Sequence, residues 1–283
     1  MALTKVYNAA TAFKNLGGVL NVYKPAGMKV KHVRNAILNN ICKGLNKMVQ
    51  REPDGSVRPR SFRRTSIPSS RPELLHSVQP GGSHQWSPSG TGQSSSIRKS
   101  RPVRVYHITG RLGSATENHL PDSRVTMRAN HRHVSADRIS GLAASIQASH
   151  QRKMFELCGV DLQTQEAYEL ACKGLLRPAD ESQPVVYGIR LVHFERPHFT
   201  LELHSINETQ EYLVALVHDL ALELRTAAHC SQLRCVRHAH FDVRDSLLRN
   251  SWHLPGIIKN LRHQRDILRA HNQQHRVELK AIH

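Results

Sequence analysis

The stretch VVYGIRLVHFERPHFTLELHSINETQEYLVALVHDLALELR, residues 185–225, decides the fold of this chain. Residues 185–194 and 199–206 are rich in β-branched and aromatic side chains, and Arg196-Pro197 between them predicts a turn, so we expect two strands. Residues 208–225 predict a helix, because one apolar stripe repeats at helical spacing: Leu213, Leu216, Val217, Leu220 and Leu224. Two strands followed by an amphipathic helix predict a sheet with helices packed on it.

The rest of the chain predicts further elements of both kinds. Predicted strands lie at residues 19–23 and 103–112, with a strand pair at 230–241. Predicted helices lie at residues 31–48, 135–146 with Ser135 as the N-cap, and 164–176. The mixture predicts the α+β class, with helices packed on a mixed or antiparallel sheet.

The chain is strongly basic. Its 283 residues carry 40 Lys and Arg against 22 Asp and Glu, a net charge of +18. Such a surplus favours a polyanionic partner, usually nucleic acid, over a generally basic organelle protein. The five cysteines form no paired framework, which fits a reducing compartment. No apolar run approaches the roughly 18 residues needed to cross a bilayer.

Residues 51–102 differ sharply from their flanks. They hold 13 Ser, seven Pro and nine Lys or Arg, without amphipathic periodicity. A segment of this composition buries too little apolar surface to offset the entropy lost on ordering. The composition therefore predicts disorder between two folded flanks.

Several short motifs, in their order along the chain, resemble one enzyme family. Residues 18–27 follow the pattern G-x-L-x-V-x-K-P-x-G, and Tyr106 precedes Leu112-Gly113-Ser114-Ala115-Thr116. Residues 162–169, 174–178 and 208–210 and the pair Leu233-Arg234 extend the match. The chain thereby resembles the TruB-type RNA pseudouridine synthases, most closely their animal mitochondrial branch. The resemblance implies a sheet core of pseudouridine-synthase type over residues 16–252.

The resemblance also implies a reaction, the isomerisation of uridine to pseudouridine within transfer or messenger RNA, without a cofactor. In this family the uridine is flipped into a pocket and an aspartate acts as nucleophile. Tyr106 matches the pocket tyrosine, and Lys24, Arg104 and Tyr106 are the candidate RNA-binding residues. Without the resemblance, Tyr106 is better interpreted as a half-buried strand residue. The arginine expected to pair with the aspartate is replaced by Val214.

The catalytic aspartate motif, approximately R-L-D-x-x-A/T-S-G-V-L, is missing from residues 51–102. The one aspartate there, Asp54, lacks every neighbour of the motif. When the possible codons of residues 80–92 are shifted by one nucleotide, however, they can spell R-V-D-x-T-S-G-V-L-V-x-L. We infer a frame error that is corrected shortly before Val103, caused by a gene-model error, a splice variant or a decayed gene. The alternatives are a catalytically inactive RNA-binding protein of the same fold and a chain that folds poorly.

Other segments carry weaker indications. The first 51 residues contain nine Lys or Arg and no acid, which is compatible with a mitochondrial presequence at 1–15 or with a plain basic RNA-contacting end. Residues 253–283 form a basic tail, helical at best. Twenty histidines include two i, i+2 pairs, but without zinc-ligand spacing we expect no metal.

Overall fold

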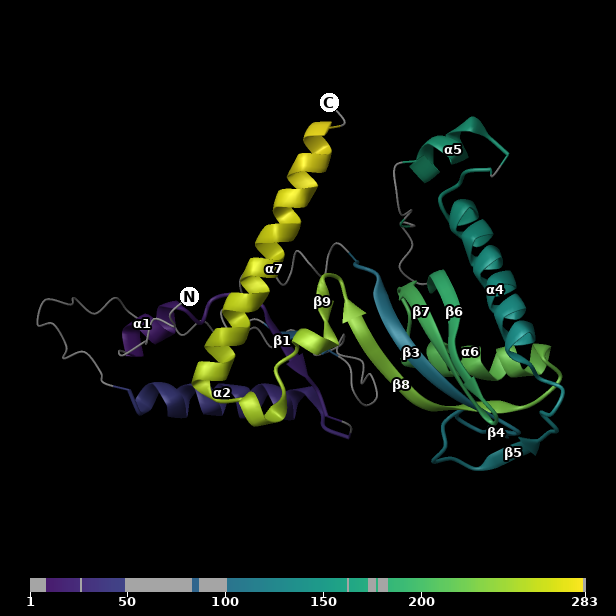
Figure 1. Cartoon of the computed structure of the whole chain (residues 1–283), viewed down its shortest axis with the longest axis horizontal. Helices are drawn as coiled ribbons and strands as arrows, with labels where there is room; N and C mark the ends of the chain where they lie inside the picture. The colour runs from purple at the N-terminus through teal and green to yellow at the C-terminus, as the bar shows by residue number, and fades with distance from the viewer. Residues whose placement is uncertain are drawn as a thin grey trace, which may run out of the picture. The chain divides into compact units, whose positions relative to one another are not determined.

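The structure is a computed structural model that describes residues 9–25, 27–48, 83–86, 101–161, 163–172, 177 and 183–281. Its described residues fall into two units, one built from residues up to 48, 83–86 and from 240 onward, the other from residues 101–239. Both helices and strands are present (Figure 1), so the predicted α+β class is confirmed. None of the helices in the described part of the chain has the length and apolar character needed to cross a bilayer.

The first unit joins the two ends of the chain. Its elements are α1 (Ala9–Lys14), β1 (Leu20–Tyr23), α2 (Val30–Asn46), β2 (Ser83–Trp86), β9 (Phe241–Asp242), the 3-10 turns η1 (Val243–Asp245) and η2 (Arg249–Ser251), and α7 (Leu254–Ala281). The predicted strand at 19–23 and helix at 31–48 are confirmed, and the helix buries Val33, Ile37 and Ile41. Asn21 forms hydrogen bonds between the two ends of the chain. Its side-chain amide donates to the Asp242 carbonyl at 2.8 Å, and its backbone N–H donates to Asn260 Oδ1 at 3.2 Å.

Two parts of the first unit differ from what the composition led us to expect. Residues 83–86, inside the segment predicted to be disordered, form β2 and pair with β1 in antiparallel register. Residues 49–82 and 87–100 lie outside the described residues. The segment that we set apart as a basic tail begins with α7, whose first turns bury Leu254, Ile257, Ile258 and Leu261 in the core of the unit.

The second unit contains the main sheet. Its elements are β3 (Arg104–Leu112), β4 (Ser114–Thr116), β5 (Val125–Arg128), α4 (Ala136–Leu157), α5 (Gln165–Cys172), β6 (Val185–Glu195), β7 (His198–Ile206), α6 (Gln210–Glu223) and β8 (Ala228–His238). The strands run in the order β6-β7-β3-β8, each antiparallel to its neighbours. The structure confirms the strands predicted at 103–112, 185–194 and 199–206, each to within one residue at either end. It also confirms the helix predicted at 208–225, to within two residues at either end. The helix predicted at 135–146 is confirmed at its start, but α4 extends further, to Leu157. The predicted strand pair at 230–241 corresponds to β8 and the two-residue strand β9 that follows it.

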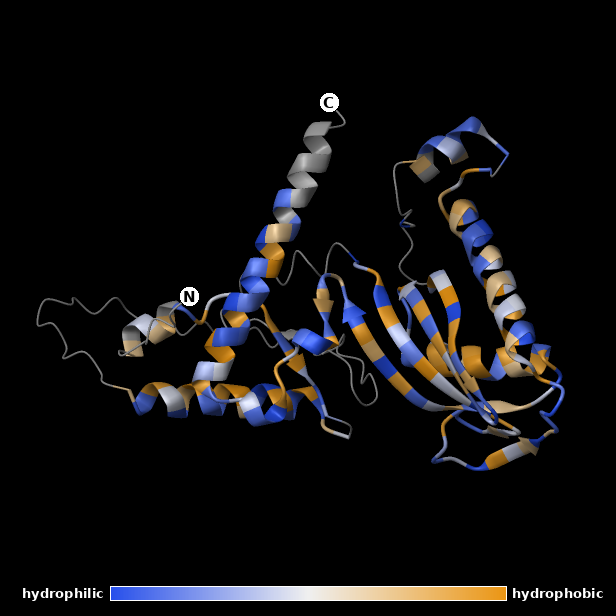
Figure 2. Cartoon of the chain, in the orientation of Figure 1, coloured by the Kyte–Doolittle hydropathy of each residue, from blue (hydrophilic) through white to orange (hydrophobic). Residues whose placement is uncertain are grey.

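One face of this sheet packs against helices. Apolar residues of β3, β6, β7 and β8 meet those of α4 and α6 in one core, and the alternation along the strands is visible in Figure 2. Gly110 lies at the closest approach, because a Cβ there would come within 2.3 Å of the Phe199 ring. The hydroxyls of Ser135 and Thr209 cap α4 and α6 by accepting hydrogen bonds from the backbone N–H groups of Arg138 and Tyr212, respectively. The face of the sheet under these helices is therefore apolar.

Candidate functional site

Tyr106 lies on β3 and faces the core under the helices. Its side chain is buried, with 1% of the residue exposed, and is among the largest fully buried side chains of the described residues. A buried phenol needs a hydrogen-bond acceptor. Its hydroxyl donates to Glu208 Oε1 at 2.6 Å, across 102 positions of sequence.

Glu208 occupies the short connection between β7 and α6. Asn207 before it has a positive φ of 56°, a conformation that asparagine tolerates better than most residues, and Thr209 after it caps α6. This turn directs the carboxylate inward, where 1% of the side chain is exposed. The Arg104 Nε lies 2.9 Å from the same Oε1, in an ion pair whose direction does not meet hydrogen-bond geometry. Arg104 keeps 35% of its side chain exposed, so the guanidinium connects a buried carboxylate to solvent.

Burial dominates the electrostatics of this cluster. Desolvation raises the pKa of Glu208, an effect that the positive charge of Arg104 and the Tyr106 hydrogen bond only partly offset. Burial, together with the negative charge of Glu208, raises the pKa of Tyr106 well above its ordinary value. Tyr106 therefore stays a neutral donor at neutral pH. The covered Glu208 carboxylate is placed to hold this hydroxyl, not to attack a bound sugar.

The other predicted site residues lie in different settings. Lys24 belongs to the first unit, and its ammonium donates to the carbonyls of Pro25 at 3.4 Å and Met28 at 3.1 Å. Burial lowers its pKa. Val214, at the position where the resemblance implies an arginine, lies on α6 and is buried in the core that this helix shares with the sheet. Within the second unit, the structure brings Arg104 and Tyr106 together through Glu208.

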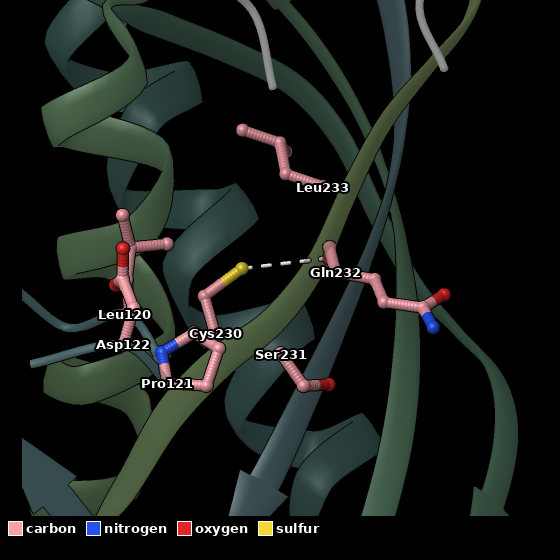
Figure 3. A pocket seen from close by; sticks show the side chains of 7 residues that line it. All are labelled: Leu120, Pro121, Asp122, Cys230, Ser231, Gln232 and Leu233. Atoms are coloured by element: carbon pink, nitrogen blue, oxygen red, sulfur yellow. Dashed lines mark hydrogen bonds between the residues drawn. The ribbon is translucent and has the colours of Figure 1, made fainter. Parts of the chain in front are cut away.

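A small hollow lies between β8 and residues 120–122. Its volume is about 180 Å³, below the roughly 300–1,000 Å³ of ordinary small-molecule sites. Figure 3 shows the Cys230 sulfur directed toward Gln232, whose carbonyl lies 3.4 Å away. Burial raises the pKa of the Cys230 thiol to about 12, so the thiol stays protonated and is a poor nucleophile at neutral pH.

Comparison with known proteins decides the family. The model of the TruB family pseudouridylate synthase N-terminal domain matches residues 90–210. The mitochondrial pseudouridylate synthase TRUB2 of Xenopus tropicalis is 34% identical over 278 residues, which cover 88% of this chain and 86% of that protein. The chain belongs to the TruB family of pseudouridine synthases. The Homo sapiens TRUB2 is 31% identical over 301 residues, covering 96% of this chain and 88% of that protein. A solved archaeal box H/ACA sRNP Nop10-Cbf5 complex contains a chain 14% identical, with a TM-score of 0.44 over 89% of this chain and 60% of that chain.

Sequence reasoning about this TruB-family chain missed the role of Glu208. The sequence indicated this residue only as part of a motif and as the start of the helix, whereas α6 begins at Gln210. No local pattern in the sequence indicated its burial, because the contact with Tyr106 joins positions 102 residues apart. The segment in which the family motif for the nucleophile is expected lies outside the described residues except for β2.

Proposed function

We propose that this protein is a mitochondrial RNA pseudouridine synthase of the TruB type, acting on transfer or messenger RNA. The observation that carries the proposal is the match to TRUB2 proteins over most of both chains, at 31–34% identity. The net charge of +18 supports an RNA substrate, because phosphate neutralisation by Lys and Arg supplies most of the sequence-independent affinity. These relatives are named as mitochondrial enzymes, which supports a mitochondrial location for this protein.

The present sequence lacks the motif of the nucleophile. We infer that the active form of the protein reads residues 80–92 in the shifted frame, which supplies an R-V-D-x-T-S-G segment with its aspartate. The present chain would then bind RNA without isomerising uridine. The second candidate function applies if the present sequence is the protein's natural form. The protein would then be a catalytically inactive RNA-binding protein of the same fold.

A paired assay separates the two candidates. The present chain and a frame-restored chain are incubated with transfer RNA that contains 5-fluorouridine, and covalent adducts are separated on denaturing gels. We expect an adduct with the restored chain alone, and salt-dependent RNA binding by both.

Each other outcome has a distinct meaning. RNA binding by both chains without an adduct from either supports the inactive RNA-binding protein. An adduct with the present chain would contradict the loss of the nucleophile. If circular dichroism shows that both chains are folded and neither binds RNA, the proposed function is overturned.

A further inference from the structure

The second unit presents an open sheet face that the proposed chemistry leaves unused. α4 and α6 pack on the opposite face, and α6 lies behind the sheet in Figure 1. Across the open face, strand register aligns Arg190 with Glu202, Glu202 with His107, and His107 with Arg234. One row of four charged or imidazole side chains therefore crosses all four strands.

Glu202 fixes the geometry of this row. Arg190 donates to it in a bidentate arrangement at 3.0 and 3.1 Å, and the ring nitrogens of His107 and His204 lie 3.2 and 3.0 Å from its oxygens. The Arg190 hydrogen bond is the largest of the effects that lower the pKa of Glu202 to about 2. The carboxylate is thus ionised throughout the neutral range. It holds three nitrogen-bearing groups in defined positions while Arg190 stays 71% exposed.

The next two rows of the same face are mixed. The row beside the central one pairs His193 with Thr200 and Thr109, and the row beyond it pairs Glu195 with His198 and Arg111. The exposed His193, His198 and Arg111 add basic or imidazole groups to the face, and Glu195 adds one acid. Val192 is the one large apolar side chain of β3, β6, β7 and β8 that is exposed, at 49%. Because the cores of protein–protein interfaces are built largely from apolar and aromatic groups, this face is poorly suited to a protein partner.

The chemistry of the face fits single-stranded RNA. Guanidinium and imidazole planes stack on unpaired bases, and their N–H groups donate to phosphate oxygens. Antiparallel sheets serve as platforms for unpaired bases in some RNA-binding modules, where side chains on the strands stack on two or three bases. Glu202 reduces the ordering cost of binding, since it already holds Arg190 and the two imidazoles.

We propose that this open face, centred on Arg190, Glu202, His107 and Arg234, is a docking surface for single-stranded RNA, separate from the Tyr106 cluster on the covered face. The inference rests on the proposed function, which makes RNA the substrate. It goes further by assigning unpaired segments of that RNA to a particular surface.

The test compares two charge-matched double variants of the full chain. Arg190→Gln with Arg234→Gln removes two charges from the open face. Arg132→Gln with Arg152→Gln removes two exposed charges of the same unit from the loop before α4 and from α4 itself. Binding of a 12-nucleotide oligouridine is measured by fluorescence anisotropy at several salt concentrations.

The open-face variant should bind at least about tenfold more weakly than the parent chain. Its slope of log K against log salt should fall by about 1.4, the loss of two phosphate contacts on a single strand. The control variant should stay within about twofold of the parent chain. Equal weakening in both variants would show a diffuse effect of net charge and would overturn the assigned surface.

Photo-crosslinking with 4-thiouridine in the same oligonucleotide locates the contact directly. Crosslinked peptides should derive from β6, β7, β3 and β8, with side chains of the open face modified. Crosslinks confined to other segments would overturn the inference while leaving RNA binding intact. Complete absence of RNA binding by the parent chain would instead count against the proposed function itself.

Discussion

Two glutamates on one sheet-and-helix unit show opposite electrostatic behaviour. Glu202 on the open face and Glu208 beside the covered face each contact an arginine and one or more further hydrogen-bonding groups. Yet the pKa of Glu202 is lowered to about 2, whereas the pKa of Glu208 is raised. The kind of partner does not explain the difference.

Solvent access and geometry explain it. Glu202 keeps 15% of its side chain exposed and receives a bidentate guanidinium, so pairing outweighs desolvation. Glu208 keeps 1% exposed and receives a single Nε contact that is poorly directed, so desolvation outweighs pairing. The charged groups of the open face therefore lose little free energy of solvation. On the covered side, Glu208 is desolvated at a larger cost in free energy and orients Tyr106.

Replacement of Glu208 by alanine should have the largest effect. The Glu208→Ala variant leaves the buried Tyr106 hydroxyl without its acceptor and opens a void under the start of α6. We expect a loss of about 2–3 kcal/mol in the free energy of unfolding. Urea denaturation at pH 7, followed by circular dichroism, measures the loss.

Glu208→Gln is the matched control, because its amide oxygen can still accept from Tyr106. It should cost less than half as much as the alanine variant. Equal losses in the two variants would mean that the charge itself, and not the hydrogen bond to Tyr106, stabilises the cluster.

The Glu208→Gln variant should also show a pH dependence with a defined sign. Because the folded pKa of Glu208 is raised, its favourable contribution is present below the unfolded value of about 4.5 and is lost as pH rises through the folded pKa. Glutamine does not ionise, so the Tm of the variant minus the Tm of the parent should increase from pH 4 to pH 8. A difference that is flat or falls over this range would contradict the raised pKa.

The Glu202→Gln variant should show a smaller effect of the opposite sign. The folded pKa of Glu202 is depressed, so its stabilisation is present above the unfolded value of about 4.5 and is lost as pH falls toward about 2. At pH 7 we expect the variant to be less stable by roughly 0.5–1 kcal/mol, since its partner Arg190 is largely solvated. Thermal melts at pH 7 and pH 3 should show the difference shrinking at the lower pH. If the variant and the parent differ in stability by the same amount at pH 7 and pH 3, the loss is due to side-chain packing and not to ionisation of Glu202.

The contrast between these two sites also marks what the sequence could predict. Strands, helices and the Ser135 cap depend on local periodicity and capping chemistry, and these predictions are confirmed for the main elements of both units. The α+β class followed from them. The short β4–β5 hairpin and β2 were missed, since three or four residues carry too weak a pattern.

The two carboxylate clusters lay beyond local patterns. Glu202 lies 95 positions from His107, and Glu208 lies 102 positions from Tyr106, so both contacts depend on strand order and register. Sequence patterns indicated that β3 and β7 exist but not that they are neighbours. The resemblance to the family supplied Tyr106 and Arg104 as candidates. It did not indicate that a buried glutamate connects them.

An uncharged pair on the open face gives the smallest prediction and isolates the contribution of charge there. Thr109 and Thr200 are cross-strand partners one row from Glu202, and their hydroxyls lie 3.1 Å apart. A double-mutant cycle with Thr109→Val and Thr200→Val should give a coupling energy of about 0.2–0.5 kcal/mol, because water can replace the lost hydrogen bond. Urea denaturation of the four proteins measures the coupling. If it exceeds that of the corresponding Arg190–Glu202 cycle, the stability of the open face derives from strand pairing, and the ion network around Glu202 serves to display charge rather than to stabilise the fold.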